Sequence, residues 1–340
     1  MFNKFMMEPN VDYAWKYSEE DYILSMFLLN SDKHLFVCTS NGVVLVVDAH
    51  VGKLIKRTNL EGVTMIFTCV QQDQKIYLGT DKGVFQVNSS LLVTSIIQED
   101  GWFEHVCLNE AGTVLLASKN KTLYWFEKQD EHFGLIKLDN SYTSTISSII
   151  FNTGSFLISN YGGNRHFTEN DPFNYDFFPW KTSLLTSSWS PNKKFIASST
   201  QENAVHFWYY PFEEGKDFQI SGYPSKIKKI LWSEDSNLLF LDEDEHVNIW
   251  DFSNGPPAGQ RPIELYCGRG RVNDFMYKNG MVIIATAYGN VFLYLLENTK
   301  NWMEQYIVSG SITTILTNEE MSTIFVGTEQ GDIYALELDI

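Results

Sequence analysis

Apolar runs alternate with polar, often glycine-bearing turns along the whole chain. Each apolar run is rich in Val, Ile, Leu and aromatic residues, and it restarts directly after the turn, as in the segment KIYLGTDKGVFQV. Regularly spaced runs of this kind, with almost no helical periodicity, predict an all-β protein. Eight segments have this strand–turn–strand pattern: residues 34–48, 75–87, 113–127, 155–168, 194–208, 237–250, 281–295 and 323–338.

These eight hairpins form a repeat. From Gly42 in the first turn to Gly331 in the last, the mean spacing is about 41 residues. Each hairpin follows another apolar run, and each except the last precedes a more polar run. The apolar runs are 23–29, 63–70, 103–108, 146–151, 184–189, 227–232, 272–277 and 312–316, and polar runs include 53–58, 91–97, 133–138 and 262–266. Four antiparallel strands per repeat of about forty residues are typical of a β-propeller blade. The pattern therefore predicts an eight-bladed propeller, with seven blades plus an extra hairpin as the alternative.

The eighth repeat ends at Ile340 without a fourth strand, whereas residues 11–17 form an alternating, β-prone run before the first repeat. If this run pairs with residues 332–338, it supplies the missing outer strand and leaves no open edge. We therefore expect residues 1–340 to form one propeller domain that an N-terminal strand closes.

Several motifs resemble the WD40 repeat. Trp250-Asp251 ends a hairpin where that repeat has its Trp-Asp dipeptide, and Trp189-Ser190-Pro191-Asn192 and Trp232-Ser233-Glu234-Asp235 resemble the turn after its inner strand. The Gly-His pair usual before the inner strand is absent, which implies that the internal His–Asp hydrogen bonds of the family are largely lost. A narrower resemblance, specific over residues 100–265, is to a group of bacterial WD40 proteins of unassigned function. It rests on residues 101–112, 160–167, 179–208, 221–232 and 250–265.

Charge and cysteine content narrow the functional classes. The formal net charge of −17 disfavours nucleic acid or an anionic membrane as the main partner. No apolar run approaches the roughly 18 residues of a membrane helix, and no secretory signal is visible. The four cysteines, at positions 38, 69, 107 and 267, have no CxxC spacing. Reduced thiols of this kind indicate a cytoplasmic protein.

The resemblance also implies where an interface would lie. In WD40 blades, the loop before the inner strand and the loop between the second and third strands open on one face, called here the top face. Projected onto this chain, the top face carries Trp102, Glu104, His105, Tyr161, Asn164, Trp180, Lys181, Tyr223, Lys226, Arg269 and Arg271. Large aromatic and arginine side chains often anchor protein interfaces. The alternative is that Trp102 and Trp180 pack between blades and the other residues form a solvated rim.

Metal and catalytic chemistry have weaker signals. Asp242, Asp244 and His246 are weak metal candidates in an acidic turn, but that turn lacks the spacing of an EF-hand loop and is more typical of a solvated loop. No HExxH, GxSxG, P-loop or dinucleotide-binding motif is present, so we expect no cofactor and no enzyme. Cys267, in a loop before an inner strand, is the thiol we expect to react.

The sequence therefore predicts a monomeric, non-catalytic scaffold that binds a protein or peptide, with a basic partner favoured. The alternative is a small-molecule or metal-linked binding protein, or a hydrolase-type enzyme, at the mouth of the channel.

Overall fold

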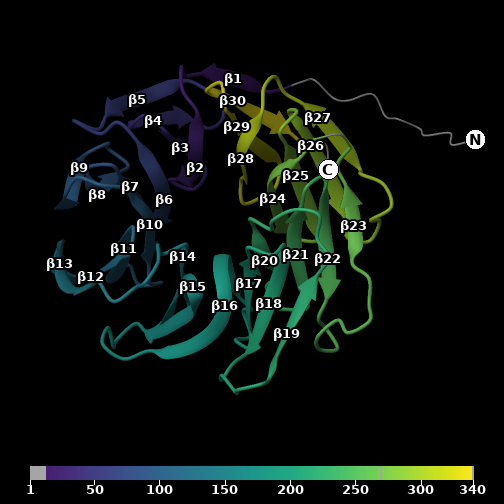
Figure 1. The fold of residues 1–340 in the computed structure, drawn as a ribbon. Coiled ribbons are helices and arrows are strands. Elements are labelled where there is room, and N and C mark those ends of the chain that lie inside the picture. The colour runs from purple at the N-terminus through teal and green to yellow at the C-terminus, as the bar shows by residue number, and fades with distance from the viewer. Residues whose placement is uncertain (1–12, 269, 339–340) are drawn as a thin grey trace, which may run out of the picture. The chain divides into compact units, whose positions relative to one another are not determined.

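A computed structural model describes residues 13–268 and 270–338. Within these residues the regular structure consists of thirty β-strands that form seven sheets (Figure 1). No helix in the described part of the chain is long and apolar enough to cross a membrane. The all-β prediction is therefore confirmed.

Six sheets have four strands each. Five of these run in chain order. The first four contain β2 (Ile23–Leu29), β3 (His34–Thr39), β4 (Val43–Asp48) and β5 (Leu54–Asn59); β6 (Ile66–Gln72), β7 (Lys75–Thr80), β8 (Gly83–Asn88) and β9 (Val93–Gln98); β10 (Phe103–Leu108), β11 (Val114–Lys119), β12 (Thr122–Gln129) and β13 (His132–Asp139); and β24 (Val272–Lys278), β25 (Met281–Thr286), β26 (Asn290–Leu295) and β27 (Glu304–Ile307). A fifth comprises β20 (Ile230–Trp232), β21 (Leu238–Glu243), β22 (His246–Asp251) and β23 (Ile263–Tyr266). The sixth joins β1 (Trp15–Ser18) to β30 (Asp332–Glu337), β29 (Thr323–Thr328) and β28 (Ile312–Thr317).

Burial within a sheet follows the sequence pattern. Strands β3 and β4 are buried over nearly their whole length, whereas the outer strand β5 is exposed at five of its six residues. A strand covered on both faces needs a continuous apolar run, and a strand at the edge does not. The apolar hairpins and the polar fourth runs are therefore the middle and outer strands that the repeat predicts.

The seventh sheet has six strands, and it overturns the predicted blade number. It contains β14 (Ser148–Asn152), β15 (Ser155–Thr168), β16 (Asp176–Trp189), β17 (Phe195–Thr200), β18 (Ala204–Tyr209) and β19 (Asp217–Ser221). The turn expected within residues 155–168 does not separate two strands, because β15 continues through Gly162-Gly163 with only a register shift between Tyr161 and Gly163. The long β15 and β16, visible as curved teal strands in Figure 1, join the fourth and fifth repeats. The prediction of eight blades is wrong: the described residues form seven sheets, one of them with two extra strands.

A buried polar network lies where these strands continue. The Ser159 hydroxyl donates to Asn164 Oδ1 at 2.6 Å and lies 2.7 Å from the Ser187 hydroxyl, while Asn164 Nδ2 donates to Ser198 Oγ at 3.0 Å. Ser187 and Ser198 are themselves 2.6 Å apart. All four side chains are buried. Hydrogen bonds of this kind satisfy groups whose burial would otherwise be costly, so the network stabilises the joint between β15, β16 and β17.

An aromatic and histidine cluster packs on the same sheet. The His206 ring stacks on Trp180 with 3.8 Å between centroids, and Asp217 lies 3.1 Å from its Nε2. Burial lowers the pKa of His206 to about 4, although the charge of Asp217 opposes the shift. Burial likewise lowers the pKa of His166, whose Nδ1 lies 3.2 Å from Asp176. Both rings are therefore neutral near pH 7.

The chain divides into two compact units. The first contains the described residues up to Thr39, residues 46–55 and the described residues from 238 onward; the second contains residues 40–45 and 56–237. Within the first unit, β1 pairs antiparallel with β30, from Trp15 opposite Ala335 to Ser18 opposite Asp332. Trp15 Nε1 also donates to the carbonyl of Ala49 at 2.9 Å. The predicted N-terminal closing strand is thus confirmed, but it begins at Trp15; residues 11 and 12 of the predicted range lie outside the described residues.

Candidate functional site

Two inner strands of the second unit begin with a β-bulge. The register of β6 with β7 shifts between Ile66 and Thr68, and that of β10 with β11 shifts between Phe103 and His105. Phe67 and Glu104 are the residues left out of the two ladders. A bulge redirects the side chain of its extra residue, so these two residues leave the regular inward and outward alternation.

Trp102, directly before β10, is the most exposed tryptophan of the described residues, with 62% of its surface accessible. Its ring lies 5.5 Å from that of Phe67, measured between centroids. Beside it is a cleft of about 510 Å³. Its lining residues are Gly101, Trp102, Glu104, Lys119, Asn120 and Thr145.

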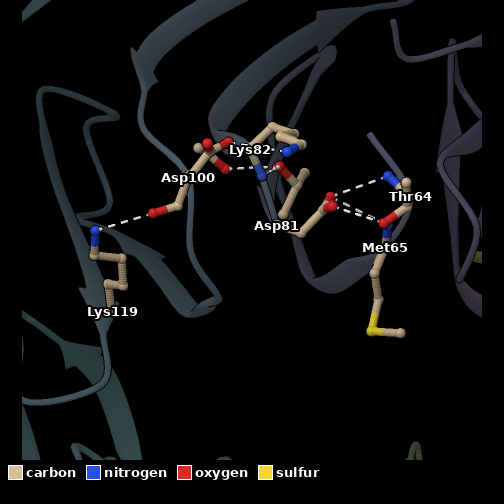
Figure 2. A network of polar contacts seen from close by, with 8 residues as sticks. Thr64, Met65, Asp81, Lys82, Asp100 and Lys119 are labelled. Carbon is tan, nitrogen blue, oxygen red and sulfur yellow. Dashed lines mark hydrogen bonds and ion pairs between the residues drawn. The ribbon is translucent and has the colours of Figure 1, made fainter. Parts of the chain in front are cut away.

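A polar network fixes the loop that carries Trp102 (Figure 2). The carboxylate of Asp81 accepts hydrogen bonds from the Thr64 amide at 3.0 Å, the Thr64 hydroxyl at 2.7 Å and the Met65 amide at 3.2 Å. Burial alone would raise the pKa of Asp81, but the three hydrogen bonds lower it by more, so the pKa lies below its usual value. The carbonyl of Asp81 in turn accepts the Gly101 amide at 3.0 Å. Asp81 therefore connects the loop before β6 to the loop before β10.

Two lysines complete the network. Lys82 pairs with Asp100 at 2.9 Å, and Lys119 pairs with Glu99 and donates to the Asp100 carbonyl at 3.2 Å. The Tyr124 hydroxyl also donates to Glu99, and burial raises the pKa of Tyr124. The positive charge of Lys119 is thus compensated by Glu99, although the lysine lines the cleft.

Gly101 is required where Lys119 approaches the loop. Its φ of +133° lies in the region that favours glycine, and a Cβ at this position would lie 2.6 Å from Lys119 Cδ. Any larger residue would push Lys119 or the loop away. The exposed Trp102 is therefore presented by a loop with a defined backbone rather than by a free tip.

The cleft brings together only some of the predicted interface residues. Trp102 and Glu104 line it, and His105 follows them in β10 with a pKa that burial lowers. Tyr161 is 55% exposed, whereas Asn164 belongs to the buried serine network. Trp180 is half-buried against His206, and Lys181 is exposed with its Nζ 5.6 Å from the Trp180 ring centroid. Lys226 in the second unit and Arg271 in the first are exposed, and Arg269 lies outside the described residues.

Two expectations about single side chains are wrong. Tyr223 does not stand at an exposed loop tip, because only 8% of its surface is accessible. Cys267 is fully buried, with its Sγ 2.7 Å from the Glu245 carbonyl. Burial and, after it, the charge of Glu245 raise the pKa of Cys267 to about 12, so this thiol is poorly placed to react.

The weak metal candidates do not come together. No group of three or more His, Cys, Asp or Glu side chains within the described ranges is arranged to hold a metal ion. Asp242 is buried while Asp244 is exposed, and the ring of His246 lies 5.2 Å from that of Tyr266. The acidic turn therefore offers no formed cation site.

A second cleft of about 440 Å³ lies at the other ends of β6, β10 and β14. It is lined by Val70, Gln71, Gln72, Cys107, Leu108, Asn109, Glu110, Phe151, Asn152 and Thr153. Burial raises the pKa of the Cys107 thiol to about 12. The rest of the lining combines apolar side chains with amides and one carboxylate, Glu110, so it offers no activated nucleophile.

Sequence reasoning missed Phe67, Lys119, Asn120 and Thr145. Phe67 and Glu104 are bulge residues. Lys119 ends β11 and Asn120 follows it before β12, in the same sheet as β10, and Thr145 lies in the loop before β14. The one local signal was Gly101 before Trp102, since glycine at a loop end indicates an unusual backbone.

Comparison with known proteins places the chain in a class by fold. No family model matches it. A chicken (Gallus gallus) protein, the serine-threonine kinase receptor-associated protein, is 19% identical over 154 residues, which are 45% of this chain and 43% of that protein. The matched region thus spans less than half of the relative's length.

Solved structures match over more of the chain. The computationally designed Ika8 protein has a TM-score of 0.79 at 11% identity, over 94% of this chain and 98% of that one. The Dos1 propeller has a TM-score of 0.77 at 14% identity, over 96% and 95%. A chain in the crystal structure of the mitotic checkpoint complex has a TM-score of 0.62 at 11% identity, over 78% and 86%.

These likenesses define the class of protein by its fold: a β-propeller, with seven sheets in the described residues, in which an N-terminal strand pairs with the C-terminal strands. At sequence identities of 11–14%, the similarity to these solved structures supports the fold and no specific function. The similarity to a bacterial WD40 group remains a resemblance, because none of these comparisons concerns that group.

Proposed function

We propose that this protein is a non-catalytic interaction platform that binds a protein or peptide at the surface around Trp102. The observation that carries the proposal is the exposure of Trp102, 62%, on a loop that the Asp81, Asp100 and Lys119 contacts hold in place. Tryptophans of this kind are frequent interface anchors. A loop that is already ordered loses little conformational entropy on binding, which favours affinity.

The class of the fold supports the proposal. The name of the chicken relative describes a protein associated with a receptor kinase, and one structural neighbour is part of a multiprotein complex. Both support protein binding as the kind of function, without naming a partner for this chain. No disulfide joins the four cysteines, all of which lie among the described residues, and this supports a location in the reducing cytosol.

Replacing Trp102 by alanine tests the proposal. The partner is first isolated by affinity purification from the native source, and binding of purified W102A is then compared with wild type. If Trp102 is an interface anchor, the affinity falls by about 2 kcal/mol or more, roughly thirtyfold. The melting temperature should hardly change, because the side chain is mostly exposed.

Leu92→Ala is the matched control, since Leu92 is 65% exposed in the same unit but does not line the cleft. L92A should bind as wild type does. Equal affinity of W102A and wild type would contradict an interface at Trp102.

A further inference from the structure

Glu104 is a charged residue without a partner in the site. It lines the cleft beside Trp102 and is partly buried. Among the described residues its carboxylate has no hydrogen bond or ion pair, whereas the other charged residue of the lining, Lys119, is paired with Glu99. A partly buried carboxylate without a partner favours a cationic ligand.

Unlike Glu104, the residues at the corresponding bulge positions of the first unit have hydrogen-bond partners. There the bulges of β24 and β28 leave out Asn273 and Thr313. Asn273 Nδ2 donates to the Ile312 carbonyl at 2.8 Å, and Thr313 Oγ1 donates to the Ile23 carbonyl at 2.6 Å. Each side chain thus donates a hydrogen bond to a backbone carbonyl of a neighbouring inner strand. A carboxylate accepts but does not donate, so Glu104 cannot make this bond and is left facing the cleft.

The surroundings of Glu104 add a second feature suited to a cation. The exposed indole of Trp102 lines the same cleft, and an indole face attracts cations most strongly among the aromatic side chains. The nearby carboxylates of Asp81, Glu99 and Asp100 outnumber the lysines Lys82 and Lys119, which are both already paired. The local field is therefore negative, as is the net charge of −17 for the chain.

We propose that this cleft binds an arginine side chain from a basic segment of the partner, with the guanidinium against the Trp102 indole and paired with Glu104. Arginine suits the site better than lysine, because its planar group stacks on aromatic rings while it bonds to a carboxylate. A cleft of about 510 Å³ is large enough for this side chain and its neighbouring backbone. The inference rests on the proposed function, since it names the chemistry of the partner at the same site.

Two peptides that differ only in charge test the inference. The probes are acetyl-Gly-Arg-Gly-amide and acetyl-Gly-citrulline-Gly-amide, in which citrulline keeps the shape of arginine without its charge. The protein carries 5-fluorotryptophan, and its 19F resonance for Trp102 is the one missing from W102F. The arginine peptide should shift this resonance saturably, and the citrulline peptide should not.

Glu104→Gln should weaken binding of the arginine peptide by roughly tenfold or more, because it removes the paired charge and keeps the size. The control is Glu110→Gln, an exposed carboxylate outside this cleft, which should bind as wild type does. Equal shifts with both peptides, or unchanged affinity in E104Q, would overturn the inference. The comparison of the two peptides on wild-type protein decides the question even if E104Q does not fold.

Different outcomes would refute the interface at Trp102 and the arginine site at Glu104. If the native partner depends on Trp102 but binds E104Q and wild type equally, the interface stands and the arginine site is wrong. If the native partner binds W102A as tightly as wild type, the proposed function is wrong whatever the peptides do.

Discussion

His206 illustrates how burial sets the chemistry of a single side chain. It is 2% exposed, stacks on Trp180 and has a pKa lowered to about 4. In the unfolded chain its pKa is about 6.5. The unfolded state therefore binds more protons in this range, so the stabilisation is complete above about pH 6.5 and is lost as the pH falls toward about 4.

We predict that the free energy of unfolding falls by up to about 3 kcal/mol over this window through His206. His206→Gln should have a flatter pH dependence than wild type in urea unfolding, because it removes the titrating ring. His132→Gln, at an exposed position, should keep the wild-type dependence. Parallel curves for H206Q and wild type would show that His206 does not titrate in this way.

Trp102 and Tyr223 show what sequence can and cannot predict about one residue. Each follows a glycine before an inner strand and was assigned to the same exposed position, yet one is 62% exposed and the other 8%. The difference in exposure between the two side chains depends on residues distant in sequence, because these are the residues that pack against a side chain and bury it. The same reason explains Cys267, whose thiol lies against the Glu245 carbonyl.

At the scale of elements, strand β1 pairs the N-terminal end of the described chain with the last strand, β30. It is only four residues long, but Lys16 pairs with Asp332 at 2.9 Å and Ser18 Oγ donates to Asp332 at 2.6 Å. Trp15 packs 5.9 Å from Phe325, measured between ring centroids. These contacts hold the closing strand along β30.

We predict that deletion of residues 1–18 exposes the edge of β30 and yields aggregated or poorly folded protein, since an unpaired strand edge can pair with other chains. Deletion of residues 1–12 leaves β1 whole and is the control. Size-exclusion chromatography and thermal melting distinguish the two. A 1–18 deletion that is monodisperse with an unchanged melting temperature would contradict the closing role.

The six-stranded sheet yields a prediction about its polar network. Asn164→Leu removes the acceptor of Ser159 and the donor to Ser198, so these two buried hydroxyls keep only their contacts with Ser187 and the network is incomplete. The loss in unfolding free energy should be about 2 kcal/mol or more. Asn170→Ala, at an exposed position of the same sheet's hairpin, should change it little, and a similar small change in N164L would show that the network does not stabilise the joint.

Much of the architecture follows from the sequence. Seven of the eight predicted hairpins are present, because apolar runs separated by short polar turns determine local pairing. The fourth predicted hairpin, residues 155–168, is absent. The glycines at Gly162-Gly163 permit both a turn and a bent, continuous strand. Pairing with β16 and the buried serine network favour the continuous strand, and neither is readable from the turn itself.

At the scale of the whole molecule, the net charge of −17 determines which encounters are favourable. We predict no micromolar binding of generic DNA or RNA at low salt, because the phosphate backbone is repelled. Association with the native partner should slow as salt rises, since screening limits the field to roughly 8 Å at physiological ionic strength. Fluorescence anisotropy and stopped-flow measurements test these two expectations. Micromolar nucleic-acid binding, or an association rate that does not change with salt, would contradict them.

Site-specific photo-crosslinking can show whether the partner contacts the surface around Trp102. Benzoylphenylalanine is placed at position 102 and, as the control, at position 92, and each protein is irradiated with the material of its native source. We expect a stoichiometric partner crosslinked at position 102 and absent at position 92, and we expect its attached segment to contain arginine. Crosslinking of the same partner from position 92 but not from position 102 would contradict an interface at Trp102.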